Sequence, residues 1–263
     1  MEQFKSPTVQ FQNVTHHYGI SPVLRDMSLD IFSGEVVAIL GPNGNGKTTM
    51  LRLMAGVMLP FRGDVLIDGT RRRASEESEL AIRSRVVYLP DDAWLPRIRT
   101  PREYVLAIAQ VYSVDPLVAM ERADRLFDLF DLNKQQNSPT DRLSQGQKKK
   151  VLLCGAFIVE SPIMLMDEPF SGGLDPGGIF ALKQLLIRRL GAKRTVVFSS
   201  PVPEIISEVA DRILIVDEGR IAAFGNVSEL CLRANAKNLE EAIATLSHRE
   251  TLDRVERYFG ESA

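Results

Sequence analysis

Apolar and polar residues alternate twice near the N-terminus and then give way to a continuous apolar run. The alternation over residues 9–14 and again over 27–32 predicts two strands with one buried face each. Residues 35–40 are almost uninterrupted in apolar character, which is typical of a strand covered on both faces. Residues 47–58 follow with apolar positions at helical spacing, so we expect a helix directly after that strand.

The middle of the chain has a different pattern. Residues 103–112 and 116–130 both show helical periodicity, without a strand pattern between them. We therefore expect an all-helical subdomain at about residues 93–155, inserted between two strands of the main sheet.

Strands return in the second half, at residues 163–166, 195–198 and 213–216, and a helix is predicted at 179–190. Strands that alternate with helices favour a mostly parallel sheet with helices on both faces. The predicted fold class is therefore α/β, with an antiparallel β N-terminal subdomain and the helical insertion. From residue 227 onward the pattern is helical and polar.

The composition is that of an ordinary folded protein. The 263 residues are 44% hydrophobic and 25% charged, enough for one large core with a smaller lobe. The net charge of −2 gives no overall basic field, so no nucleic-acid partner is expected. Basic clusters at residues 71–73 and 148–150 are interpreted as solvated faces. Cys154 and Cys231 are interpreted as reduced thiols, as in cytosolic proteins.

Membrane insertion has little support in the sequence. The longest nearly uninterrupted apolar run, residues 151–159, is far shorter than the roughly 20 residues that span a bilayer. The first ten residues contain no apolar stretch of the kind found in secretory signals. Any role at a membrane is therefore expected to require another chain.

The clearest chemistry lies in the segment GPNGNGKT, residues 41–48, which fits the motif G-x-x-x-x-G-K-[ST] at every fixed position. It stands between the predicted buried strand and the predicted helix, where backbone amides and the helix dipole favour phosphate. Lys47 is expected to reach the β- and γ-phosphates, and the Thr48 hydroxyl to bind Mg²⁺. The predicted nucleotide-binding residues of this loop are Gly41, Pro42, Asn43, Gly44, Asn45, Gly46, Lys47, Thr48 and Thr49.

A second element can complete this site. Residues 163–168 form an apolar strand that ends in two carboxylates, Asp167 and Glu168. At the carboxyl edge of a parallel sheet, Asp167 can bind the metal and Glu168 can activate a water. Glu168 is therefore the candidate catalytic residue, with ATP and Mg²⁺ as the expected ligands.

Residues 143–147, Leu-Ser-Gln-Gly-Gln, precede a basic helix and then the Asp167 strand. This arrangement resembles the signature motif of ATP-binding cassette (ABC) ATPases, and the resemblance covers roughly residues 8–225. Tyr18 stands where that family stacks an aromatic ring on adenine, and Leu174-Asp175 matches the family's D-loop. The implied domains are a nucleotide-binding domain over residues 1–225 and a short helical extension over 226–263.

The family resemblance also implies a mechanism. Two cassettes pair head to tail, as a homodimer or a heterodimer, and each ATP lies between one phosphate loop and the other signature. Ser144, Gly146 and Gln147 would then contact the partner's nucleotide. Closure on ATP would drive an integral membrane subunit, with the cassette peripheral on the cytoplasmic face of the membrane.

The segment VVFSSPVPE, residues 196–204, departs from that family. The family places a histidine after this strand, where it contacts the γ-phosphate and the attacking water, and the matching residue here is Pro201. Proline has neither a side-chain donor nor a backbone N–H. The remaining alternative is a hydroxyl contact from Ser199 or Ser200.

Two further departures lie nearby. Asp91 replaces the glutamine of the family's Q-loop, and its carboxylate can bind Mg²⁺ or repel the γ-phosphate. Residues 170–173 place four residues before Leu174 where the family has three, and the extra glycine is expected to loosen the D-loop. The residues that hold ATP therefore match the family, whereas those that time hydrolysis do not.

Several functions remain open at this point. The chain can be the ATP-hydrolysing subunit of a transporter, or a weakly catalytic subunit that completes a partner's active site. A soluble cassette of iron–sulfur assembly is a third alternative. The helical C-terminus at residues 238–246 is more typical of exporter-type cassettes. Trp94 is expected either to dock the membrane partner or to pack in the core.

Overall fold

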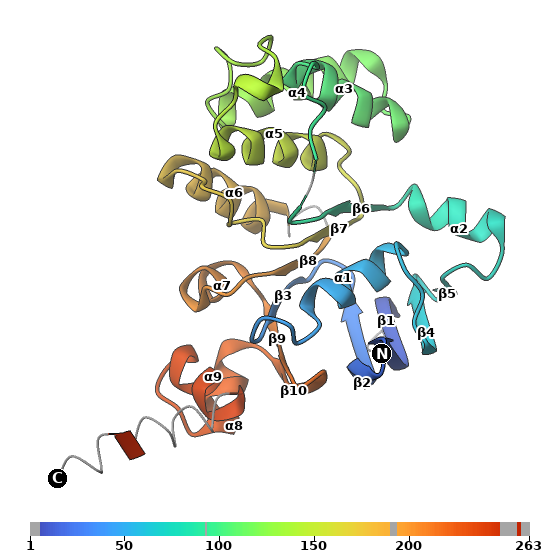
Figure 1. The fold of residues 1–263 in the computed structure, drawn as a ribbon, viewed down its shortest axis with the longest axis vertical. Coiled ribbons are helices and arrows are strands. Elements are labelled where there is room, and N and C mark those ends of the chain that lie inside the picture. Colours follow the sequence, from blue (N-terminus) through green and yellow to red (C-terminus); the bar gives the residue numbers. More distant parts are fainter. Residues whose placement is uncertain (1–5, 93, 190–193, 248–256, 259–263) are drawn as a thin grey trace, which may run out of the picture.

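Six strands form a mostly parallel sheet through the middle of the molecule (Figure 1). The computed structural model describes residues 6–92, 94–189, 194–247 and 257–258. The order across the sheet is β10-β9-β3-β8-β7-β6, and only the β9–β10 pair is antiparallel. The strands are β3 (Val36–Leu40), β6 (Val86–Leu89), β7 (Ile163–Met166), β8 (Thr195–Ser199), β9 (Arg212–Asp217) and β10 (Arg220–Gly225).

A second sheet, entirely antiparallel, forms the N-terminal part, in the order β2-β1-β4-β5. Its long hairpin contains both of the alternating segments predicted from the sequence. The strands are β1 (Pro7–Tyr18), β2 (Ser21–Phe32), β4 (Arg62–Ile67) and β5 (Thr70–Arg71). The predicted α/β class with an antiparallel N-terminal part is confirmed.

Strand β3 is buried on both faces, as its continuous apolar run predicts. Val36 and Ala38 pack in a core cluster with the helices of one face, whereas Val37 and Ile39 pack in a second cluster with β1, β2 and β4. Helix α1 (Lys47–Ala55) fills the space between the two sheets. It ends earlier than predicted because Gly56 adopts a left-handed conformation and caps its last carbonyls.

Short helix α2 (Glu76–Arg83) precedes β6, and Arg72 lies just before it. The sequence places Arg72 on a solvated face, which is wrong: the residue is 4% exposed. Its guanidinium donates to Glu79 Oε1 at 2.9 Å and to the carbonyl of Met54. The ion pair therefore ties the end of α1 to α2.

The helical insertion lies between β6 and β7 and forms a separate group at one end of the molecule (Figure 1). Its helices begin at capping residues: Thr100 and Ser144 each form a capping box, and Asp115 accepts from two amides. The elements are α3 (Pro101–Val111), α4 (Pro116–Leu129), the 3₁₀ turn η1 (Thr140–Arg142) and α5 (Gln145–Ile158). Helix α5 is buried along most of its length.

The remaining helices are α6 (Pro176–Arg189), α7 (Pro203–Val209), α8 (Val227–Ala234) and α9 (Leu239–Ser247). Leu230 and Ile243 place α8 and α9 in the same core cluster as the main sheet, while the domain boundary at residue 225 stays a prediction. The predicted end of α6 at Leu190 lies outside the described residues. Among the residues that are described, no helix has the length and apolar character needed to cross a bilayer.

Candidate functional site

The loop from β3 to α1 packs against β9 of the main sheet and against β2 of the N-terminal sheet. A Cβ at Gly41 would overlap the carbonyl oxygen of Val216 in β9, so only glycine fits there. Gly46 has φ +94°, and a Cβ there would overlap the Leu24 side chain in β2. Asn45 Nδ2 donates to Asp217 Oδ1 at 3.1 Å. The backbone of the loop is therefore fixed on both sides.

Lys47, the first residue of α1, lies inside this loop and is only 5% exposed. Its ammonium donates to the carbonyl oxygens of Gly41 at 2.7 Å and Pro42 at 3.0 Å. Burial lowers its pKa, while the carboxylates of Glu168 and Asp167 act in the opposite direction. The lysine and the two carboxylates predicted from separate motifs are thus electrostatically coupled.

Asp167 and Glu168 follow β7, whereas the phosphate loop follows β3. Strand β8 lies between β3 and β7 in the sheet. Ser199, the last residue of β8, connects Asp167 and Glu168: its hydroxyl donates to Asp167 Oδ1 at 2.6 Å and accepts from the Glu168 amide at 2.9 Å. Ser199 is fully buried. Its hydroxyl is therefore committed to the Asp167 carboxylate and the Glu168 backbone amide. The Ser200 hydroxyl accepts from the Val202 amide, a bond that does not use its own hydrogen.

The residues around this edge fit a magnesium ion bound together with phosphate. Asp167 is 3% exposed and offers an oxygen ligand, and the Thr48 hydroxyl lies at the start of α1. Mg²⁺ in nucleotide sites commonly takes one or two protein oxygens beside phosphate and water. No group of three or more acidic, histidine or cysteine side chains with metal-binding geometry occurs within the described ranges.

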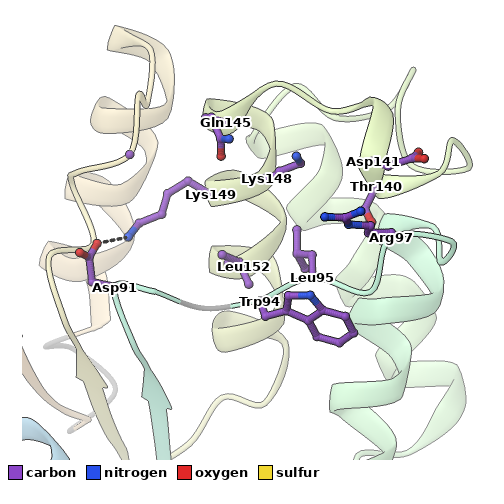
Figure 2. Close-up of a pocket in the computed structure, with 11 residues that line it drawn as sticks. Asp91, Trp94, Leu95, Arg97, Thr140, Asp141, Gln145, Lys148, Lys149 and Leu152 are labelled. Carbon is purple, nitrogen blue, oxygen red and sulfur yellow. Dashed lines mark ion pairs between the residues drawn. The ribbon is translucent and has the colours of Figure 1, made fainter.

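Asp91 lies in a network that the sequence did not reveal (Figure 2). Its Oδ1 accepts from Ser171 Oγ at 2.9 Å and lies 3.6 Å from Lys149 Nζ, and Figure 2 shows that ion pair as a dashed line. Lys149 Nζ also donates to the Glu168 carbonyl at 3.0 Å. The negative charge expected at residue 91 therefore has a nearby positive partner. Metal binding by Asp91 stays a prediction.

The interpretation of residues 148–150 as a solvated face is wrong for two of the three lysines. Lys149 is 4% exposed and Lys150 is 6% exposed, because α5 packs between the other insertion helices and the sheet. Lys150 Nζ donates to Asp175 Oδ2 at 2.7 Å. This bond and the Gly178 amide both lower the pKa of Asp175.

The longer D-loop is held at several points, contrary to the looseness expected from its extra glycine. Gly172 and Gly173 both adopt positive φ, near +80°. The Gly173 carbonyl lies so close to Gly146 that a Cβ on Gly146 would overlap it. Together with the Lys150–Asp175 ion pair, this contact fixes the loop against α5.

The signature residues lie at the N-terminus of α5. Ser144 Oγ accepts from the Gln147 amide at 3.2 Å, and Gln147 Oε1 accepts from the Ser144 amide at 3.0 Å. These bonds form the capping box that starts the helix. Gly146 packs on the D-loop rather than on the phosphate loop.

Tyr18 is 53% exposed at the β1–β2 turn, and its hydroxyl contacts Met58 Sδ at 3.4 Å.

A hollow of about 570 Å³ lies between the segment after β6 and α5. Trp94 lines it and is 72% exposed, so the alternative that Trp94 packs in the core is wrong. Leu95 is buried beneath it, and Lys148 and Leu152 line the wall on α5 (Figure 2). The hollow adjoins Asp91, so it is contiguous with the Asp91–Lys149 pair.

Comparison with known families and proteins adds an independent result. The family model described as ABC transporter matches residues 24–171. The SkfA peptide export ATP-binding protein SkfE of Bacillus subtilis is 30% identical over 81% of this chain and 87% of its own length. An uncharacterized ABC transporter ATP-binding protein of Nostoc is 30% identical over 82% of this chain, but that match spans only 64% of the relative.

Solved structures show the same arrangement. The ATP-binding subunit of an ABC transporter superposes with a TM-score of 0.84 at 27% identity, over 91% of this chain and 99% of that one. An ATP-binding cassette solved as a dimer in a post-hydrolysis state, bound to ADP and Pi, gives a TM-score of 0.75 at 25% identity. That match covers 83% of this chain and 98% of the solved one.

Proposed function

The chain belongs to the ABC transporter family as an ATP-binding subunit, and we propose that its own site binds Mg-ATP tightly but hydrolyses it slowly. One observation carries the binding half. The ammonium of Lys47 is held inside the phosphate loop and is coupled to Asp167 and Glu168, which follow β7 at the same edge of the sheet. A phosphate loop, a metal-binding carboxylate and a base therefore converge on one place.

The chain's own residues have distinct tasks in this proposal. Backbone amides of the loop and Lys47 bind the phosphates, and Tyr18 stacks on the base. Bound Mg²⁺, held by Thr48 and Asp167, supplies charge neutralisation on the phosphate oxygens. Glu168 orients the attacking water and accepts its proton.

The proposal of slow hydrolysis rests on the residues that follow β8. Pro201 stands where the family has a histidine, and it offers no donor to the γ-phosphate. The Ser199 hydroxyl already donates to Asp167, and Ser200, whose hydroxyl accepts from the Val202 amide, offers only a neutral donor one residue earlier. The residues that we propose to bind ATP are all present in the chain, whereas the side-chain donor expected to strengthen in the transition state is missing.

The partners follow from the family and from two surfaces. We propose that a second cassette, identical or different, pairs head to tail and brings its nucleotide to Ser144, Gly146 and Gln147. The hollow beside Trp94 receives an integral membrane subunit of the transporter, on the cytoplasmic side of the membrane. A similar bacterial ABC transporter cassette, solved as a dimer, supports the pairing.

Replacement of Lys47 tests the binding half of the proposal. Lys47→Ala removes the only charged group of the loop and should weaken Mg-ATP binding by about ten- to a hundred-fold, the value of a charge-assisted bond. Isothermal titration calorimetry gives the affinity directly. Lys183→Ala is the matched control, because Lys183 forms a salt bridge with Glu208 between α6 and α7. Equal affinities for Lys47→Ala and the control would refute the assignment of the loop.

A further inference from the structure

Lys149, a buried residue of α5, connects this helix to the segments that follow β6 and β7. Lys149 Nζ lies 3.0 Å from the Glu168 carbonyl oxygen and 3.6 Å from Asp91 Oδ1. We propose that Lys149 is a positioning residue, which orients Glu168 for hydrolysis and neutralises Asp91 so that the nucleotide can bind. The proposal rests on the proposed function, since it concerns the same nucleotide site.

The proposed orientation of Glu168 rests on the geometry around this residue. Glu168 adopts φ +43°, a left-handed conformation that side chains other than glycine rarely take. Its amide is held by Ser199 Oγ at 2.9 Å. Its carbonyl accepts from Lys149 Nζ at 3.0 Å, and within its own turn from Ser171 Oγ at 2.7 Å and the Ser171 amide at 3.1 Å. Both peptide groups that flank the Glu168 side chain are therefore fixed, one from β8 and the other from α5. Removal of the lysine would leave the carbonyl with donors from Ser171 alone and would release the turn at residues 168–171 from α5. We expect the direction of the Glu168 carboxylate to change with it.

The proposed neutralisation of Asp91 rests on the charge of the Lys149 ammonium. The Lys149 side chain is 5% exposed, while the Asp91 side chain is 53% exposed. A buried ammonium is unfavourable unless it is paired and hydrogen-bonded, and Asp91 is the acidic side chain nearest to it among the ion pairs described. In turn, Asp91 without Lys149 would place a net negative charge beside Asp167 and Glu168, where phosphate must approach.

The two roles predict different losses. The hydrogen bond to Glu168 affects the rate of the chemical step, because a misplaced base raises the barrier without changing ground-state contacts. The positive charge affects the affinity for ATP, because it balances a neighbouring anion. A lysine that only stabilised the fold would not separate rate from affinity in this way.

The test uses the purified full chain and two measurements. Titration calorimetry gives the Mg-ATP affinity, and single-turnover hydrolysis of radiolabelled ATP with protein in excess gives the rate, even when it is slow. Lys149→Met should weaken ATP binding about three- to ten-fold. It should also lower the single-turnover rate about ten- to a hundred-fold. In the double variant Asp91→Asn/Lys149→Met, the affinity should recover and the rate should not.

The control is Lys183→Met, which removes a lysine from the ion pair between α6 and α7. Lys149→Gln serves if the methionine variant does not fold, because it removes the charge but keeps a polar side chain. It must show the same affinity loss and the same recovery with Asp91→Asn.

Three results would overturn the inference. If Lys149→Met behaves like Lys183→Met in both measurements, Lys149 positions nothing. Affinity that fails to recover in the double variant would exclude Asp91 as the partner. A rate that recovers together with the affinity would exclude the tether on Glu168. Failure of the proposed function looks different, because the parent protein would then show no Lys47-dependent binding of ATP.

Discussion

Restoring a histidine at residue 201 should speed ATP hydrolysis at this chain's own site. Strand β8 lies between β3, which leads into the phosphate loop, and β7, which leads to Glu168. Pro201 follows the end of β8 by two residues and is exposed. A side chain that begins there lies at the sheet edge shared by Lys47 and Glu168. Pro201→His adds one donor at this edge.

The expected gain in hydrolysis rate depends on which hydrogen-bond donors the structure already provides near residue 201. Ser199 gives its hydrogen to Asp167, whereas Ser200 accepts from the Val202 amide and offers only a neutral hydroxyl one residue before Pro201. One preorganised donor to the transition state is worth about a hundred- to a thousand-fold in rate, or roughly 3–4 kcal/mol. The loss of the rigid ring costs about 0.4–1 kcal/mol of unfolding free energy, a small part of the stability of a typical domain.

Single-turnover hydrolysis of radiolabelled ATP is the assay, with Mg-ATP affinity measured in parallel. The expected gain lies between ten-fold and the full thousand-fold of a well-placed donor, while affinity stays within about two-fold. Pro201→Ala is the matched control, because it relaxes the same backbone without adding a donor. Its rate should equal that of the parent.

Two results would refute this reasoning. If the parent protein hydrolyses ATP rapidly and Glu168→Gln abolishes the activity, the site is competent without a histidine. If Pro201→Ala accelerates hydrolysis as much as Pro201→His, the backbone and not the side chain limits the rate. Little effect of Glu168→Gln in a complex that still hydrolyses ATP would assign the turnover to the partner cassette.

Three other changes test separate parts of the molecule. Tyr18→Ala should cost about 1–3 kcal/mol of ATP binding in a titration, whereas Tyr18→Phe should be mild; unchanged affinity in the alanine variant would place the base elsewhere. Trp94→Glu should abolish co-purification with the membrane subunit and leave ATP binding intact, and loss of both would contradict a docking role. Arg72→Met should lower the free energy of unfolding in urea by about 3 kcal/mol, because it leaves Glu79 buried beside a single exposed arginine; parental stability would contradict that.

The strands could be predicted because burial alone determines their pattern. Strand β7 agrees with its predicted bounds, and the continuous apolar run of β3 corresponds to packing on two faces. Helix ends were less predictable, since they depend on single capping residues. Gly56 ends α1 three residues before the periodicity does, because it is free to adopt a left-handed conformation.

The candidate site was predictable only where residue type and spacing suffice. The phosphate loop follows from fixed glycines and Lys47 in a short segment. The buried lysines of α5 do not, because three consecutive lysines suggest a solvated face unless their partners are known. Lys150 meets Asp175 across 25 residues of chain, and Ser199 meets Asp167 across 32. Such pairs exist only once the sheet and the insertion have packed together.

The end of β8 gives a structural basis for the proposed separation of nucleotide binding from hydrolysis. Ser199 holds Asp167 and the Glu168 amide from inside the core, where it is fully buried. Pro201 lies beyond that contact, on the exposed side of the strand end. We therefore expect a change at residue 201 to leave Asp167 and Glu168 in place, because Ser199, two positions earlier, supports them. ATP-driven closure can then persist while the rate of the chemical step changes, which is the behaviour needed if one cassette of a pair acts mainly through ATP binding.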